Sequence, residues 1–172
     1  MTTTTRDARN GRPSITPAAP YLLERGFPEW AILEVGWRVE PLGPRYRRYG
    51  LPAEAADALV WLIPSRHPNG RVWFERMRFI DPADLERFGG GKYRQPARDQ
   101  VGTGLQLYDP YLLLSTEKWE PRDSILLIES EANTVAVHTL LPEDAVIGLP
   151  GQSTLTQKMA RELAAIPWSS CG

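Results

Sequence analysis

The chain has 172 residues, a length typical of one domain, and 42% of them are hydrophobic, which is enough for a buried core. Its 20 basic and 21 acidic side chains give a net charge of -1, which excludes binding to nucleic acid through overall positive charge, so any polyanion site must be local. The one cysteine, Cys171, excludes a disulfide framework and a cysteine-rich zinc site. No run reaches the roughly 18 apolar residues of a membrane span, and the polar start lacks the apolar core of a signal peptide. We therefore expect a cytoplasmic protein that does not contact a membrane.

Residues 1–16 are rich in threonine and have no hydrophobic periodicity, which predicts a disordered tail. The following segment, residues 17–59, has the features of a small helical part. Gly26 is expected to end a first helix and Pro28 to open a second, because glycine and proline favour these two positions. A third helix is expected at 52–59, where alanines and early acidic residues favour helix formation.

Strand patterns begin at residue 60, and residues 60–121 are expected to form a β-rich subdomain. The sequence ALVWLIPSRHPNGRVWFERMRFI contains two strand-forming runs separated by a turn-forming Pro-Asn-Gly, which predicts a hairpin. In the second run, Arg76 and Arg78 occupy alternate positions, so part of one face of that strand is expected to be cationic. A long connection with several glycines follows, and its length is more typical of a functional loop than of a simple link.

The pattern changes again in residues 122–172. An apolar run at 125–128 predicts a strand that is buried on both faces. A helix is expected over 132–141, a second strand over 145–151 and a second helix over 154–163. This order indicates parallel strands joined by a right-handed crossover. The chain is therefore expected to have an α+β fold, in which a helical part and a β-hairpin region precede a parallel βαβα unit.

Two acidic residues follow the first of these parallel strands. Glu129 ends the apolar run, and Glu131 lies two residues further on. Ligands of open parallel sheets bind at the carboxyl ends of the strands, and a carboxylate there can hold Mg²⁺ together with waters and phosphate oxygens. Glu129 is therefore the main candidate for a metal ligand and a catalytic residue. Glu131 has three interpretations: a second ligand, a general base, or an acid favoured by the helix dipole.

These segments resemble a known family. The sequences ILLIESEANTVAVHTL and AVIGLPG are similar to the first half of a Toprim domain, the metal-binding α/β module of bacterial-type primases, topoisomerases and related nucleases. In that family the first strand ends in a glutamate that is usually followed by glycine. Glu129 matches the glutamate, and Ser130 stands at the glycine position.

The sequences ahead of Glu129 resemble primases in particular. WLIPSRHPNGRVWFERMRF, KYRQP and LYDPYLL are similar, in this order, to the segments that precede the Toprim glutamate of primases. This resemblance extends over residues 60–151, and residues 20–58 resemble the N-terminal helices of the same catalytic core. Each motif is short, so the resemblance depends on their order.

The resemblance implies a DNA primase-like protein of DNA replication, of phage, plasmid or mobile-element type, a class often joined to a replicative helicase. The implied activity is Mg²⁺-dependent nucleotidyl transfer from nucleoside triphosphates on a single-stranded DNA template, with Glu129 holding Mg²⁺ or Mn²⁺ and Glu131 beside it. Five basic residues would line the groove for nucleotide and template: Arg66, Arg76, Arg78, Lys92 and Arg94. Their side chains suit this role because guanidinium and ammonium groups bind phosphate oxygens.

The sequence departs from the family in one respect. A complete Toprim domain continues to a third strand with an Asp-x-Asp pair that supplies further metal ligands, and no such pair follows the second predicted helix. One glutamate alone would bind Mg²⁺ weakly, because the ion gives up its water reluctantly. We therefore expect a core that is truncated, is completed by another polypeptide, or no longer catalyses the reaction.

Other interpretations stay open. A non-catalytic module could bind single-stranded nucleic acid or a replication partner in the same groove, and an unrelated α/β protein could carry Glu129 only as a helix-start residue. The hairpin arginines could be solvated, or paired with Glu75 or Glu86. Four tryptophans at apolar positions are expected in the core: Trp30, Trp37, Trp61 and Trp73.

Overall fold

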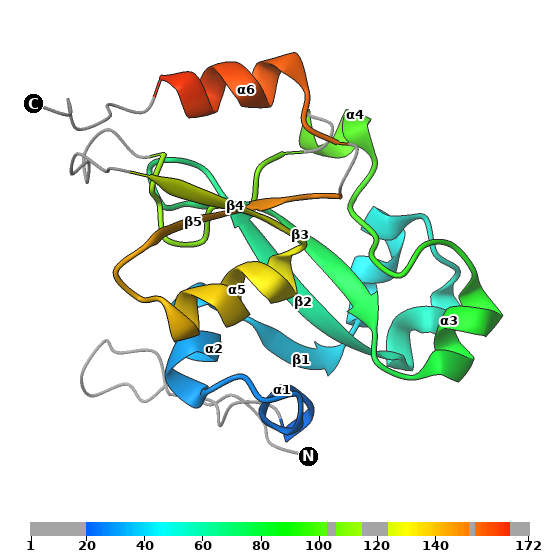
Figure 1. Cartoon of the computed structure of the whole chain (residues 1–172). Coiled ribbons are helices and arrows are strands. Elements are labelled where there is room, and N and C mark those ends of the chain that lie inside the picture. The colour runs from blue at the N-terminus through cyan, green and yellow to red at the C-terminus, as the bar shows by residue number, and fades with distance from the viewer. Residues whose placement is uncertain (1–19, 103–105, 115–123, 152–153, 166–172) are drawn as a thin grey trace, which may run out of the picture.

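The computed structural model describes residues 20–102, 106–114, 124–151 and 154–165. It contains a three-stranded antiparallel sheet and a two-stranded parallel sheet with helices around them (Figure 1), which confirms the expected α+β fold class. The tail expected at 1–16 lies outside the described residues, and the boundaries between the expected subdomains stay a prediction. Within the described part of the chain, no helix has the length and apolar composition needed to cross a membrane.

The N-terminal part begins with α1 (Pro20–Glu24) and α2 (Glu29–Val35). Gly26, with φ of +87°, lies between them, in a conformation that glycine adopts without steric cost. Two 3₁₀ helices follow, η1 (Gly43–Tyr49) and η2 (Ala53–Asp57). The third expected helix, at 52–59, is thus only the short 3₁₀ helix η2, because the chain is already extended at Ala58.

The antiparallel sheet has the order β1-β2-β3, formed by β1 (Arg38–Pro41), β2 (Leu59–Arg66) and β3 (Val72–Phe79). β2 and β3 form the hairpin that the sequence predicts. β1, for which the sequence has no strand pattern, pairs with the other edge of β2. The central strand β2 is buried over most of its length.

Two hydrophobic cores meet at β2, because successive side chains of a strand point to opposite faces. Trp61 and Ile63 belong to the core formed with α1 and α2, which also includes residues of the later helix α5 (Glu131–Leu140). Val60 and Leu62 belong to the core formed with η1 and η2. The antiparallel sheet is therefore covered on both faces.

The parallel sheet consists of β4 (Ile125–Glu129) and β5 (Ala145–Leu149), and α5 (Glu131–Leu140) joins them. This arrangement confirms the predicted strand–helix–strand unit. The last helix, α6 (Gln157–Ala164), packs through Met159 against Ile147 of β5. α5 instead contributes Ala132 and Val135 to the core of the N-terminal helices. The βαβ unit is therefore packed directly on the antiparallel part.

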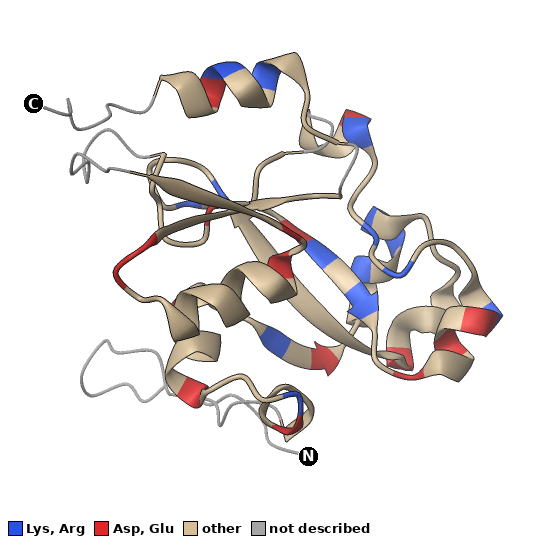
Figure 2. Cartoon of the chain, viewed as in Figure 1, with Lys and Arg blue, Asp and Glu red and all other residues tan. Residues whose placement is uncertain are grey.

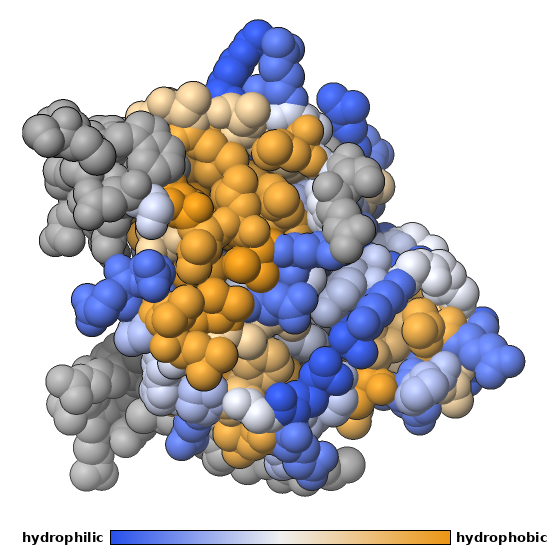
Figure 3. All heavy atoms as spheres, viewed as in Figure 1, coloured by the Kyte–Doolittle hydropathy of each residue, from blue (hydrophilic) through white to orange (hydrophobic). Residues whose placement is uncertain are grey.

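β4 differs from the expectation that it is buried on both faces. β5 is almost entirely buried, whereas β4 is half-buried and Leu127 is 41% exposed. Figure 3 shows a broad apolar area on the face of the molecule where Figure 1 places β4. The physical reason is that, among the described residues, β5 alone pairs with β4, so one edge of β4 has no neighbouring strand.

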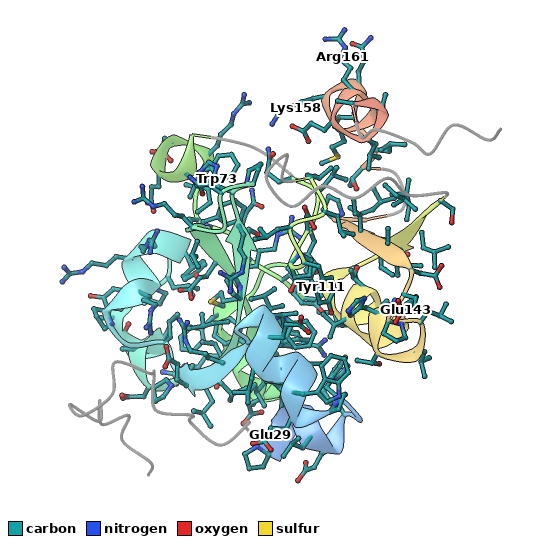
Figure 4. The ribbon with its side chains drawn as sticks, turned by 90° about the vertical axis from the view of Figure 1, so that its left-hand side faces the viewer. Glu29, Trp73, Tyr111, Glu143, Lys158 and Arg161 are labelled. Carbon is teal, nitrogen blue, oxygen red and sulfur yellow. The ribbon has the colours of Figure 1, made fainter. Side chains whose placement is uncertain are left out.

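Two short helices lie in the segment that the sequence presents as a long connection. α3 (Pro82–Phe88) is capped by Asp81, whose Oδ1 accepts a hydrogen bond of 2.8 Å from the Ala83 backbone N–H. α4 (Arg98–Val101) lies beside Trp73, whose Nε1 donates to the Val101 carbonyl at 3.1 Å (Figure 4). The connection is therefore built into the fold at several points.

The tryptophan prediction is only partly correct. Trp37 and Trp61 are buried in the first core, and Trp73 is half-buried. Trp30 is 49% exposed on α2, because Ala31, Ile32 and Val35 form the buried side of that helix.

Candidate functional site

The turn between β4 and α5 presents Glu129 at the carboxyl end of the parallel sheet, where its side chain is exposed. Ser130, the next residue, has φ of +73° and ψ of 154°, a backbone conformation that strongly favours glycine. Its Oγ accepts a hydrogen bond from the Asn133 N–H at 3.4 Å, and its own N–H donates to the Leu149 carbonyl at 2.9 Å. The unusual φ gives a physical reason why glycine is common at this position in the family that the sequence resembles.

Glu131, the first residue of α5, faces the hairpin and not the solvent. It is 2% exposed, and its Oε1 accepts a hydrogen bond from Nη1 of Arg76, which is 7% exposed. Figure 2 shows the basic residues of β3 beside the acidic start of α5. In this arrangement the Arg76 guanidinium and the Glu131 carboxylate are each other's partner, and both side chains are buried. A general-base role for Glu131 and a phosphate-binding role for Arg76 stay predictions.

Arg78 lies on the same side of β3 as Arg76, because it is two residues further along the strand. Its Nη1 lies 3.3 Å from the Tyr93 hydroxyl oxygen, to which it donates, and its guanidinium lies over the Tyr93 ring, 5.5 Å from the centroid. Tyr93 belongs to the segment KYRQP, so this segment is brought against the cationic side of the hairpin.

Arg94 is held next to β3 by its backbone, which exchanges two hydrogen bonds of 2.8 Å with Met77. Its Nη2 donates to the carbonyl oxygens of Phe88 and Gly89. The end of α3 and the first glycines after it therefore contact this guanidinium, and a side chain at Gly90 would occupy the same space.

The other two predicted basic residues lie at the end of β2 and in the loop after α3. Arg66, at the end of β2, donates from Nη1 to the Gly70 carbonyl at 3.1 Å, and Lys92 is exposed in the loop after α3. Within the described ranges, no carboxylate lies within 4 Å of a nitrogen of Arg66, Arg78 or Arg94. Glu75, a suggested partner of these arginines, instead pairs with Arg38 at 2.5 Å.

Tyr108 is a residue whose importance to the site region could not be inferred from the sequence beyond its place in LYDPYLL. Its hydroxyl accepts a hydrogen bond of 2.8 Å from Trp37 Nε1, and its backbone exchanges two hydrogen bonds of 2.8 Å with Gly148 of β5. Burial raises the pKa of the Tyr108 hydroxyl well above its usual range. Tyr108 thus connects the N-terminal core to the parallel sheet, its hydroxyl is uncharged, and it lies near the Glu131 side chain.

The acidic residues offer limited support for a metal ion. Among the residues that the structure describes, no group of three or more His, Cys, Asp or Glu side chains could hold a metal. Glu129 supplies one exposed carboxylate at the end of β4. One carboxylate fits a Mg²⁺ ion that arrives with triphosphate oxygens, because such an ion keeps most of its other ligands from water and phosphate.

Comparison with solved structures finds similarity to the catalytic cores of bacterial primases. The chain is 22% identical to a DnaG primase catalytic domain that was solved bound to single-stranded DNA, with a TM-score of 0.55 over 88% of this chain and 55% of that one. It is 18% identical to the Aquifex aeolicus primase zinc-binding and RNA polymerase domains, with a TM-score of 0.60 over 86% of this chain and 40% of the other. It is 21% identical to the E. coli primase catalytic core, with a TM-score of 0.54 over 83% of this chain and 51% of the other.

These similarities establish the fold. The chain spans about half the length of these primase structures. No protein-family model matches the sequence, and the curated proteins contain no significant match. The resemblance to primases that the sequence indicates is therefore confirmed at the level of the fold, whereas its Toprim assignment and its phage, plasmid or mobile-element type stay predictions.

Proposed function

We propose that this chain is a primase-like protein of DNA replication, whose site lies between the carboxyl end of β4 and the cationic side of β3. The observation that carries the proposal is the contact between Arg76 and Glu131, which places Arg78 and the turn bearing Glu129 on the same part of the molecule. The primase-like fold supports the same interpretation.

In this function the basic residues bind phosphate groups of the template and of the incoming nucleoside triphosphate. Arg78 and Arg94 have no carboxylate partner among the described residues, so their guanidinium groups keep charge that can attract phosphate. Lys92 is exposed nearby in sequence, and Arg66 extends the set to the tip side of the hairpin. Tyr93 holds Arg78 from one side and so limits its rotation.

Glu129 is the proposed metal-binding and catalytic carboxylate. A Mg²⁺ or Mn²⁺ ion, when bound there, would neutralise charge on the triphosphate. Glu129 is well placed for this because it is exposed at the end of β4, and because the hydrogen bonds of Ser130 fix the turn that carries it. A single carboxylate of this kind would bind the ion weakly until the triphosphate is present.

The wider biological setting is also proposed from the resemblance of the sequence. We place the protein among Toprim-type primases of phages, plasmids or mobile elements that act in the cytoplasm. The expected partners are single-stranded DNA, nucleoside triphosphates, and a replicative helicase or a polypeptide that supplies the rest of the Toprim domain.

A second candidate function is a module that binds single-stranded nucleic acid or a replication partner without catalysis. The same arginines support it, because binding of a phosphate backbone needs positive side chains and no metal ligand. The two functions differ in what they require of Glu129.

Primer synthesis tests the two functions. Wild-type protein is incubated with a single-stranded template, nucleoside triphosphates and Mg²⁺, next to Glu129→Gln and the control Glu29→Gln, which changes an exposed glutamate at the start of α2 (Figure 4). Catalysis predicts products that are lost in Glu129→Gln and kept in Glu29→Gln. Binding of the template without any product supports the second function, and neither product nor binding contradicts both.

Binding of DNA is tested at the arginines. Arg78→Met should weaken binding of labelled single-stranded DNA and lower the slope of log affinity against log salt by about 1, because one phosphate contact is lost. The control Arg161→Met removes an exposed arginine of α6 (Figure 4) and should leave both quantities unchanged. Equal effects of the two substitutions would contradict the proposed site.

A further inference from the structure

The ion pair between Arg76 and Glu131 differs from the other ion pairs of the described residues. Its side chains are 8% and 3% exposed, whereas every other pair has at least one side chain that is more than 30% exposed. The two residues are 55 positions apart in the sequence and lie on β3 and α5. The pair is therefore a buried contact between the hairpin and the βαβ unit.

A pair of this kind is a weak source of stability. Removing two charges from water costs several kcal/mol for each ion, and apolar residues of similar volume often stabilise a protein as well or better. What an ion pair supplies, and apolar residues do not, is direction, because the hydrogen bond is strong only over a narrow range of geometry. The pair is therefore better suited to orient the residues next to it than to stabilise the fold.

The pair acts on the two groups that the proposed function uses. On the β4 side, Glu131 is separated from Glu129 only by Ser130, whose backbone has few alternatives at φ of +73°. On the hairpin side, Arg76 is two residues from Arg78, and both side chains leave the same face of β3. A fixed contact between Arg76 and Glu131 therefore limits the separation of the Glu129 carboxylate and the Arg78 guanidinium.

We infer that Arg76 and Glu131 are positioning residues, which hold Glu129 and Arg78 at the separation needed to bind a nucleoside triphosphate together with its metal ion. This inference rests on the proposed function, and it gives the two residues a role other than direct contact with substrate. It also gives a reason for a charged pair at a buried position, where apolar residues of similar volume often stabilise a protein as well or better.

The test separates orientation from stability by changing both residues together. The variants are Arg76→Met, Glu131→Met, the double variant with both changes, and the charge-exchanged variant Arg76→Glu/Glu131→Arg. Arg38→Met is the control, because it removes an arginine from an ion pair of the same sheet with Glu75. Melting temperature and the Kd for nucleoside triphosphate with Mg²⁺ are measured for each protein, and primer synthesis is resolved into kcat and KM.

Each single variant should melt at a clearly lower temperature, because one buried charge is left without a partner. The double methionine variant should melt close to the wild type and yet bind the triphosphate about ten- to a hundredfold more weakly, since small misplacements of binding groups have effects of this size. The control should bind as the wild type does. A double variant that is as stable as the wild type and binds equally well would overturn the inference and leave the proposed function intact.

Hydrogen exchange gives a second measurement that depends on neither ligand nor activity. In Glu131→Gln, the Ser130 amide, which donates to Leu149, should exchange faster than in the wild type, while the amides of β2 and β3 should keep their rates. Unchanged exchange at Ser130 would show that the pair does not order the turn. If the wild type binds neither triphosphate nor DNA, the proposed function fails, and this measurement alone decides whether the pair holds the turn in place.

Discussion

The two sheets of the molecule are covered to different extents. The antiparallel sheet β1-β2-β3 has a hydrophobic core on each face, so that its central strand is almost completely buried. In the parallel sheet, β5 is buried and β4 is half-exposed, and the proposed site lies at the end of β4. We therefore expect the antiparallel part to provide most of the stability, whereas the parallel part carries Glu129, the proposed metal-binding residue.

The largest expected effect is in the antiparallel part. Trp61 is fully buried, and its ring centroid lies 4.6 Å from that of Trp37. Trp61→Ala should lower the free energy of unfolding by about 3–5 kcal/mol, because it leaves a cavity between the helices and the sheet. Leu127→Ala, in the half-exposed strand β4, should lower it by less than about 2 kcal/mol. Urea unfolding measures both, and equal losses would contradict the difference between the two sheets.

A smaller loss of stability is expected at Gly148 of β5, where the parallel part is tightly packed. A Cβ atom at Gly148 of β5 would lie 2.5 Å from Thr134 Oγ1 and 2.9 Å from Tyr108 Cβ. Gly148→Ala should therefore lower the free energy of unfolding by about 1–3 kcal/mol, because α5 or Tyr108 must move. Gly91→Ala is a matched control, since its Cβ would meet only ordinary contacts. Thermal unfolding of the two variants compares them.

Ser130 allows a change that should increase stability. Ser130→Gly removes the strain of the backbone with positive φ, and the loss of the Ser130 cap costs only a few tenths of a kcal/mol. The free energy of unfolding should therefore rise by about 1 kcal/mol. Ser130→Ala keeps the strain and loses the side-chain hydrogen bond to Asn133, so it should be less stable than the wild type. The opposite signs distinguish backbone strain from capping, and a loss of stability in both variants would show that capping dominates.

The smallest effect concerns pH. His138 of α5 lies against Tyr111, with ring centroids 3.8 Å apart, and burial lowers the pKa of His138 below its usual 6.5, although Glu34 acts in the opposite direction. The folded state therefore binds the proton less readily than the unfolded state. The neutral His138 side chain consequently contributes fully to the free energy of unfolding above pH 6.5, and this contribution is lost as the pH falls through the lower pKa of the folded state.

His138→Phe keeps a ring against Tyr111 and removes the titration. As the pH is lowered from about 8 to about 5, the wild type should therefore lose stability relative to the variant. Chemical denaturation at a series of pH values measures this difference, and a constant difference over the range would show that His138 does not contribute to the pH dependence.

The elements with a strong local pattern could be predicted from the sequence. The hairpin follows from two strand-forming runs around Pro-Asn-Gly, and the βαβ unit follows from two apolar runs around a helical segment. β1 could not be predicted in the same way, because it has only four residues and depends on pairing with β2, about twenty positions away in the sequence. The exposure of Leu127 is likewise a property of the surroundings of β4 and not of its own sequence.

The candidate site could be predicted in its residue types but not in its contacts. Glu129 and Arg78 follow from position and charge, and whether they act on a ligand stays a prediction. The pairing of Arg76 with Glu131 joins distant segments, and the position of Arg94 among the carbonyls after α3 depends on loop geometry. The first contact forms only when the hairpin and α5 come together, and the second depends on the path of the loop between Phe88 and Arg94, so neither follows from hydrophobic periodicity.

Tyr108 has a mechanical consequence for the whole molecule. Its hydroxyl accepts a hydrogen bond from Trp37 in the N-terminal core, and its main chain is hydrogen-bonded to Gly148 of β5, so this one residue joins the antiparallel part to the parallel part. Heating should therefore melt them in a single cooperative transition. A protease acting on the native protein should not release either half as a stable fragment.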